Sequence, residues 1–244
     1  MKTSFYFVLW IGIYLLIDIF GGRSLQVNSF YIALIAVWAI SGILNKATAN
    51  QQAYMANREG AAFLELVYRN DYKRYLGIFR RKMLFDAATF IYFVITIIFL
   101  LMIHESLLIV AIFAFFGYGS AKATLESYRF YSKVKEDGKI TIPDDEESIE
   151  QYNRYSEMRQ TYQADEMCPP PTLKDKLLRG CNFGFSILSI LLGILYIVTC
   201  VPGLIGHGAV RMGAAMMVAY GGLAFIYGIN DLITTSNGYN TNIN

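Results

Sequence analysis

The sequence predicts an all-α polytopic integral membrane protein, with six transmembrane helices in three hairpins and a helical cytoplasmic layer. Three observations lead to this fold class: six long apolar stretches, few charged residues, and basic residues concentrated in particular segments. About 20 apolar helical residues match the ~30 Å hydrocarbon core of a bilayer, and shorter stretches can cross where flanking side chains reach the interface. The apolar stretches cover residues 5–20, 27–44, 84–103, 107–121, 183–201 and 209–229.

The composition favours a membrane protein over a soluble one. Hydrophobic residues make up 55% of the chain and charged residues 16%, whereas soluble domains carry about 25% charged residues. The three cysteines lack the spacing of a metal site or a disulfide framework. The first apolar stretch is not followed by a small-residue cleavage site, so we expect it to be retained as a helix.

The distribution of basic residues predicts the orientation in the membrane. Of the 21 Lys and Arg residues, all lie in the N-terminus, segment 45–83 or segment 122–182, except Arg23 and Arg211. Cytoplasmic flanks of membrane helices collect Lys and Arg. We therefore expect both termini and both long connections in the cytoplasm and three short turns outside. The expected location is the plasma membrane or a bacterial inner membrane.

This topology divides the chain into hairpins and cytoplasmic segments. The three hairpins alternate with two cytoplasmic helical connections, the first basic and amphipathic and the second containing a Pro-rich linker, and a polar cytoplasmic tail follows. The expected boundaries are 1–45, 83–121 and 183–230 for the hairpins, 46–82 and 122–182 for the connections, and 231–244 for the tail.

The first long connection contains an amphipathic pattern. Apolar residues recur at spacings of three and four between positions 64 and 79, which predicts a single helix with one apolar face. Two interpretations stay open: a helix lying on anionic lipid, where each basic residue contributes about 1 kcal/mol, or a cytoplasmic helix packed against its neighbours. The candidate surface for lipid or a protein partner comprises Tyr68, Tyr72, Lys73, Arg74, Tyr75, Arg80, Arg81 and Lys82.

The second long connection predicts three helical segments. The helix of the fourth apolar stretch is expected to continue until Asp137 and Gly138. The acidic run at 144–147 is placed where negative charge favours a helix N-terminus, and that helix should reach about residue 164. After three prolines, Thr172 and Asp175 resemble a capping box that opens the helix leading into the fifth stretch. The mixed charges of this connection do not predict a nucleic-acid surface.

Charged residues within membrane segments are candidates for function, because they cost at least about 2.5–3.5 kcal/mol near the bilayer centre. Asp18 and Arg211 lie near the outer ends of the first and last apolar stretches. They predict a structural charge pair that closes the bundle, or charges that simply reach water at the helix ends, or a substrate or ion site. His104 and His207 fall in outer turns, where a zinc or proton site is a minor alternative to lone loop histidines.

The last apolar stretch is rich in small residues. Such residues let membrane helices approach closely, either within one subunit or between subunits. The candidate helix-packing face comprises Gly213, Gly221, Gly222 and Gly228.

The sequence offers little chemistry on this scaffold. It predicts no catalytic residue, no metal site and no cofactor, and so no enzymatic activity. We expect a non-catalytic accessory or scaffold subunit of a membrane complex, with a transporter or channel subunit as the alternative and a membrane enzyme acting on lipid or envelope precursors as the third. The expected partners are the lipid bilayer and either another protein or a second copy, bound through the cytoplasmic helices or the last apolar stretch. No nucleic-acid partner is expected.

Overall fold

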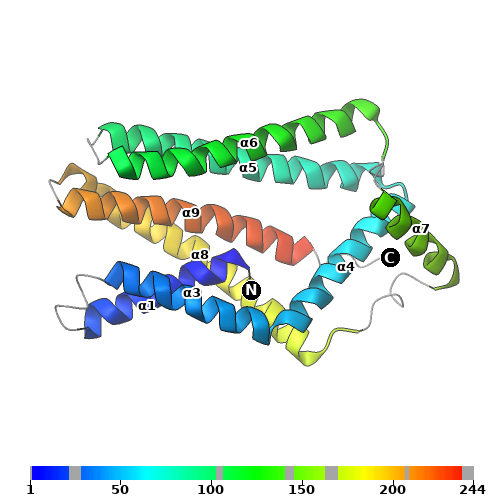
Figure 1. The fold of residues 1–244 in the computed structure, drawn as a ribbon, viewed down its shortest axis with the longest axis horizontal. Coiled ribbons are helices and arrows are strands. Elements are labelled where there is room, and N and C mark those ends of the chain that lie inside the picture. Colours follow the sequence, from blue (N-terminus) through cyan, green and yellow to red (C-terminus); the bar gives the residue numbers. More distant parts are fainter. Residues whose placement is uncertain are drawn as a thin grey trace. The chain divides into compact units, whose positions relative to one another are not determined.

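The computed structural model describes residues 2–21, 29–102, 107–140, 146–162, 170–206 and 209–237, and within these ranges the chain forms only helices (Figure 1). The predicted all-α class is therefore confirmed for this part of the chain. The helices are α1 (Thr3–Phe20), α3 (Ser29–Ala47), α4 (Ala49–Tyr68), α5 (Tyr72–Met102), α6 (Leu107–Asp137), α7 (Glu146–Thr161), α8 (Leu173–Cys200), the 3-10 helix η1 (Val201–Ile205) and α9 (Ala209–Asn237).

Several of these helices suit a membrane by length and composition. Among the described residues, four helices are long and apolar enough to cross a membrane. A bent pair of helices would be a fifth span if the pair is counted as one. The bent pair joins Ile32–Ala47 to Ala49–Tyr68 at an angle of 71°. The four candidates are Thr3–Phe20, Tyr72–Met102, Leu173–Ile205 and Gly213–Ser236. The lengths and compositions of these helices thus support an integral membrane protein with four or five candidate spans.

The chain folds as two compact units, which divide within α4 and again at residue 170. The first unit contains residues 1–56 and 171–240. In it, α1 packs against α3, α8 and α9, and α8 packs along α9 (Figure 1). The buried centre around α1 consists of Trp10, Ile11 and Ala33. The opposite face of α3 carries exposed apolar side chains such as Trp38, 77% exposed, as expected of a helix whose outer face contacts lipid.

The second unit contains residues 57–170 and 241–244. Its main element is the pair of long helices α5 and α6, which lie side by side (Figure 1). Phe79 and Phe130 stack with ring centroids 6.1 Å apart, and Ser127 donates a hydrogen bond to the Asp86 carboxylate. The α6 helix ends at Asp137 and Gly138 follows with a φ of 61°, so the predicted end of this helix is confirmed.

The prediction of one amphipathic helix across residues 64–79 is wrong, because α4 ends at Tyr68 and α5 begins at Tyr72. Asn70 adopts a left-handed φ of 54°. Its N–H bonds to the Val67 carbonyl and the Asp71 N–H to the Leu66 carbonyl, both at 3.0 Å. These two bonds form a Schellman motif, in which asparagine is one of the few residues that tolerates the left-handed position.

Asp71 then starts the next helix. Its Oδ1 accepts a hydrogen bond from the Arg74 backbone N–H at 3.1 Å, which is the usual side-chain cap for a helix N-terminus. The residue pair 70–71 therefore stops one helix and starts another. Apolar periodicity does not report this break, because the spacing of apolar residues continues across it.

Two further features of the segments that flank the apolar stretches can be compared with the predictions. The capping box at the start of α8 is confirmed: the Thr172 N–H donates to Asp175 Oδ2 at 2.8 Å, and the Asp175 N–H donates to Thr172 Oγ1 at 3.3 Å. The helix expected after the acidic run is α7, which begins at Glu146. By contrast, α9 extends to Asn237, beyond the boundary at 231 where a polar tail was expected.

Candidate functional site

A buried polar cluster lies inside the first unit, where α1, α8 and α9 meet. Its members Ser4, Asn182, Ser186 and Asp231 are all at most 4% exposed. The Ser4 N–H donates to Asp231 Oδ2 at 2.7 Å, and the hydroxyls of Ser4 and Ser186 are 3.2 Å apart. The Lys2 N–H donates to Asn182 Oδ1 at 3.2 Å. Side chains of α8 and α9 thus bind the first residues of α1.

The first N–H groups of any α-helix have no acceptor within that helix. In α1 no side chain at the N-cap position Lys2 provides one. Asp231 supplies a carboxylate from another helix instead, at the end where the helix dipole favours negative charge. The cluster therefore joins the C-terminal part of α9 to the first turn of α1, and it gives the buried Asp231 carboxylate a hydrogen-bond partner.

A second buried cluster lies in the second unit and joins α4 to α7. Its centre is Glu65, whose side chain is almost fully buried at 4% exposure. The Tyr155 hydroxyl donates to Glu65 Oε2 at 2.6 Å, and Arg159 Nε donates to the same oxygen at 3.1 Å. Arg69 Nε donates to Oε1 at 2.6 Å. Tyr155 is itself 4% exposed, so the contact between these two segments, 90 residues apart, has a polar interior.

Opposing effects set the pKa of Glu65. Burial raises the pKa of this carboxyl, but hydrogen bonds from Arg159, Tyr155 and Arg69 lower it more, and its pKa lies below the ordinary value. The hydrogen bond to Glu65 likewise raises the pKa of the Arg159 guanidinium. Both groups are therefore charged at neutral pH. The Arg159 guanidinium also lies 5.9 Å from the centre of the Tyr68 ring, within reach of a cation–π contact.

The predicted lipid or partner face is distributed over two helices rather than one. Tyr68 ends α4 and is 39% exposed, whereas Tyr75 on α5 is 4% exposed and packs against Phe63. The Tyr72 hydroxyl donates to the Val134 carbonyl at 3.1 Å, so this side chain holds α5 to α6. The basic residues of this face are exposed: Lys73, Arg74, Arg80, Arg81 and Lys82.

Two of these basic residues form ion pairs with nearby carboxylates, one on α5 and one at the residue that caps α5. Lys82 Nζ lies 2.9 Å from Asp86 Oδ2, and Arg74 Nε lies 3.4 Å from Asp71 Oδ2. Only the aromatic members Tyr72 and Tyr75 have become part of the interior of the unit. The basic members lie on the surface of the unit, and their binding to lipid headgroups or to a partner stays a prediction.

The structure places the two predicted membrane charges on neighbouring helices. Asp18 is exposed near the end of α1, and Arg211 is half-buried near the start of α9. The Nε of Arg211 is buried and has no hydrogen-bond partner among the described residues. The pairing of Asp18 with Arg211 stays a prediction. His104 and His207 lie outside the described residues.

The small residues of α9 differ in how closely they approach α8. A Cβ at Gly221 would lie 2.9 Å from the Gly193 carbonyl oxygen, and one at Gly228 would lie 2.8 Å from Ile190 Cγ1. Gly213 has open space around it, and Gly222 is half-buried. The helices α8 and α9 therefore approach most closely through Gly193, Gly221 and Gly228.

Sequence reasoning missed the central residues of both clusters. Glu65 falls at a polar position of the amphipathic pattern at 64–79, and Asp231 falls at the first position of the expected polar tail, so neither was a candidate. The available signals were weak: Glu65 and Arg69 have the i, i+4 spacing of an ion pair, and Tyr155 belongs to an irregular apolar stripe. Neither signal identifies the partner helix.

The described residues contain no group of three or more His, Cys, Asp or Glu side chains arranged to hold a metal ion. Cys181 is exposed and Cys200 half-exposed, and both are free thiols. The two polar clusters are thus the candidate sites that this part of the chain offers, and each joins helices through hydrogen bonds. Comparisons with protein-family models, with curated proteins and with solved structures found no match for this chain.

Proposed function

We propose that this chain is a non-catalytic scaffold subunit of a membrane complex, with six spans and a preformed cytoplasmic docking surface. The observation that carries the proposal is the buried Glu65 cluster. It joins the first cytoplasmic connection to the second through Tyr155 and Arg159. Connections that merely linked spans would need no such ordered polar interior. A surface that is already ordered binds a partner at a lower entropic cost.

The six-span topology is part of this proposal. Length and composition identify four or five candidate spans. In the proposed topology the additional crossing is α6, since its first half, 107–121, is apolar. The concentration of basic residues supports cytoplasmic termini and connections. In this arrangement α4, α7 and the first turns of α5 lie in the cytoplasm, and a plasma membrane or bacterial inner membrane is the proposed location.

The buried Asp231 cluster favours a second candidate function, a transport or channel subunit. Ionisable groups inside membrane bundles are costly and commonly mark ion or substrate pathways. However, Asp231 accepts the Ser4 N–H, and the hydroxyls of Ser4 and Ser186 lie 3.2 Å apart. Because these groups bind one another, the cluster is better explained by helix packing. The scaffold function is therefore preferred.

The test is mild extraction of the native complex, followed by mass determination and identification of every co-purifying chain. The proposal expects a stoichiometric protein partner that is retained less well by Glu65→Gln, with Glu157→Gln, an exposed α7 residue, as the matched control. Purified protein in liposomes should conduct no ions or small solutes. Recovery without a partner, or partner retention unchanged by Glu65→Gln, would contradict the docking surface. Solute flux that Asp231→Ala abolishes would support transport instead.

A further inference from the structure

The exposed side of α5 forms one continuous stripe along the helix. The side that is buried in the second unit, where α5 packs against α6, contains Tyr75, Thr89, Phe93, Thr96 and Leu100. The opposite side carries large apolar residues, each more than half exposed, at Leu84, Ile91, Ile95, Ile98 and Met102. Their spacings of seven, four, three and four place them on one helix face. Because α5 is a candidate span, this is the face that lipid tails would cover.

The stripe becomes basic at the end of α5 that precedes the apolar residues. Arg81 and Arg80 lie three and four positions before Leu84, so both are on its side of the helix. Both arginines are exposed. Arg81 Nε donates only to a neutral group, the Gly77 carbonyl, at 3.4 Å. A Cβ at Gly77 would have no atom within 4 Å, so the surface one turn before the arginines is open.

The length of α5 indicates how deep the two arginines lie in a bilayer. The helix has 31 residues, about 46 Å at 1.5 Å per residue, whereas the hydrocarbon core is about 30 Å thick. The segment from Leu84 to Met102 accounts for about 27 Å of this length and matches the core. Arg80 and Arg81 then lie about 5–6 Å outside it, which is the depth of the lipid headgroups.

The carboxylates near this end of the hairpin pair with other basic residues. The acidic residues between positions 66 and 103 are Asp71 and Asp86. The ion pairs in this region are Arg74 with Asp71 at 3.4 Å, Lys82 with Asp86 at 2.9 Å, and Lys122 with Glu126 at 4.0 Å. Arg80 and Arg81 take part in none of the ion pairs found among the described residues. The basic end of the stripe therefore attracts anions.

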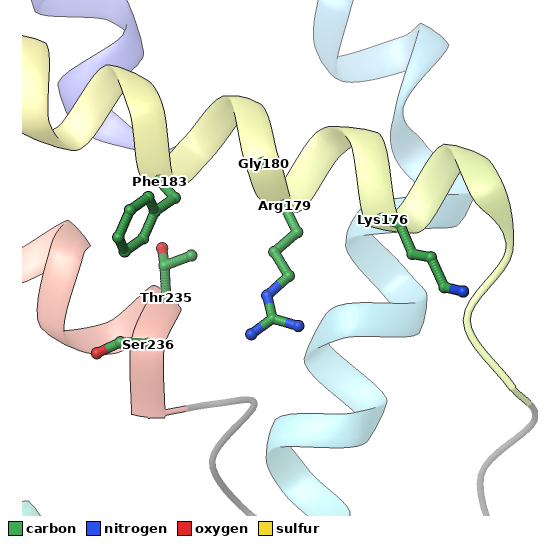
Figure 2. A pocket seen from close by; sticks show the side chains of 6 residues that line it. All are labelled: Lys176, Arg179, Gly180, Phe183, Thr235 and Ser236. Carbon is green, nitrogen blue, oxygen red and sulfur yellow. The ribbon is translucent and has the colours of Figure 1, made fainter.

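The basic start of α8 provides a comparison, since it also precedes an apolar stretch. Lys176 is one of the residues that line a hollow of about 350 Å³ between α8 and α9 (Figure 2). Figure 2 shows its side chain extending away from Phe183, where the apolar stretch begins. Lys174 and Lys176 are both exposed and lie nine and seven positions before that stretch. This pair carries the same charge as the two arginines but lies further from the hydrocarbon core.

We infer that Arg80 and Arg81, beside the open surface at Gly77, bind the headgroup of an anionic phospholipid whose acyl chains contact Leu84. Guanidinium groups form charge-assisted hydrogen bonds with phosphate oxygens, and the apolar stripe continues in the direction that the acyl chains take. In the proposed topology this lipid belongs to the cytoplasmic leaflet. The site requires that α5 crosses the membrane and is otherwise independent of the scaffold function.

The test measures lipid retention by the purified full-length chain with native mass spectrometry, in mixed micelles of phosphatidylglycerol and phosphatidylcholine. The wild type should retain phosphatidylglycerol preferentially. Arg80→Gln with Arg81→Gln should lose roughly tenfold or more of this preference, given about 1 kcal/mol per basic residue near an anionic surface. Lys174→Gln with Lys176→Gln is the control of equal charge and should retain most of the preference. Equal losses in the two double variants, or no loss in the arginine variant, would overturn the site.

A second variant separates the loss of charge from an effect on folding. Arg80→Lys with Arg81→Lys keeps both positive charges at the same depth and should retain most of the preference for phosphatidylglycerol. A loss as large as in the glutamine variant would show that charge is not the cause and would overturn the site. A protein that co-purifies with the wild type but not with the glutamine variant, while the lipid preference stays unchanged, would identify a protein as the occupant and overturn the lipid assignment.

Discussion

At Glu65, three donors surround one buried carboxylate. The Tyr155 hydroxyl and the Arg159 guanidinium come from α7, and the guanidinium of Arg69 comes from the residue that follows α4. Tyr155 and Arg159 are four residues apart, so consecutive turns of α7 present both groups to the same acceptor. Since the carboxylate is removed from water, its charge is compensated by these partners rather than by solvent. The α4–α7 contact therefore includes a buried charge whose partners come from both segments.

Glu65→Gln should weaken the α4–α7 contact by roughly 1–3 kcal/mol, because a neutral amide accepts weaker hydrogen bonds and directs N–H groups at existing donors. The effect is measured as faster amide hydrogen exchange in α7 and a lower thermal unfolding midpoint. Glu157→Gln on the exposed side of α7 is the control and should change neither. Equal exchange rates in α7 for Glu65→Gln and the wild type would contradict this role.

The lowered pKa of Glu65 predicts a pH dependence of the same contact. A carboxyl whose folded pKa lies below its unfolded value contributes stability above the unfolded pKa, about 4.3 for glutamate. It loses that contribution as the pH falls through the folded pKa. The difference in unfolding midpoint between wild type and Glu65→Gln should therefore be constant from neutral pH to about 5 and shrink below about 4. A difference that instead disappears near pH 6 would contradict the assignment.

Asp231 acts at the same scale in the first unit, as an acceptor for the Ser4 N–H of α1. Asp231→Ala should destabilise the first turn of α1 by roughly 1–3 kcal/mol, because a buried N–H loses its acceptor. Asp231→Asn is the control, since its Oδ1 can still accept the bond, and it should lie close to the wild type. Hydrogen exchange at residues 3–6 measures the effect. Equal losses in Asp231→Asn and Asp231→Ala would show that the charge of the carboxylate, and not its role as an acceptor, matters.

At the scale of helices, the contact of α8 with α9 depends on small residues. A Cβ at Gly193 would lie 2.6 Å from the Gly221 carbonyl oxygen and 2.8 Å from the Phe225 backbone nitrogen. Both are backbone atoms, which cannot move aside as a side chain can. Close approach of this kind is the usual basis of helix association in membranes, where lipid is as apolar as the side chains.

Gly193→Ala should accordingly separate α8 from α9 and destabilise the first unit by roughly 1–3 kcal/mol, the usual cost of overpacking. Gly184→Ala on the same helix has no atom within 4 Å of the added Cβ and should be neutral or slightly stabilising, because alanine favours helix more than glycine does. Thermal unfolding midpoints of the two variants in the same detergent measure this. Equal midpoints would show that the close approach is not required for stability.

The helix break at Asn70 and Asp71 also belongs to this scale. It is built entirely from local chemistry: one asparagine with a left-handed φ and one aspartate that caps the following helix. The break determines which residues of the amphipathic segment can face the same side. As a result Tyr75 packs against Phe63 from the preceding helix, while Tyr68 approaches Arg159 of α7.

For the whole molecule, the decisive question is how many times the chain crosses the membrane. In the proposed six-span topology residue 106 is outside and residue 160 is in the cytoplasm. After replacement of the three native cysteines by serine, an impermeant maleimide should label Ser106→Cys in intact cells. It should label Gln160→Cys only after permeabilisation. Equal labelling of both positions would show that α6 does not cross the membrane and would leave the four or five candidate spans.

The sequence by itself determined the helical class, the apolar helices and several helix ends, because these depend on neighbouring residues along the chain. The stop after Asp137 and the capping box of Thr172 with Asp175 are examples. The break at Asn70 was equally local but was missed because apolar spacing continued through it. Only the tertiary structure decided the partners of Glu65 and Asp231. Their hydrogen bonds join segments 90 and 227 residues apart, and a pattern of neighbours cannot specify which distant donor will meet a buried carboxylate.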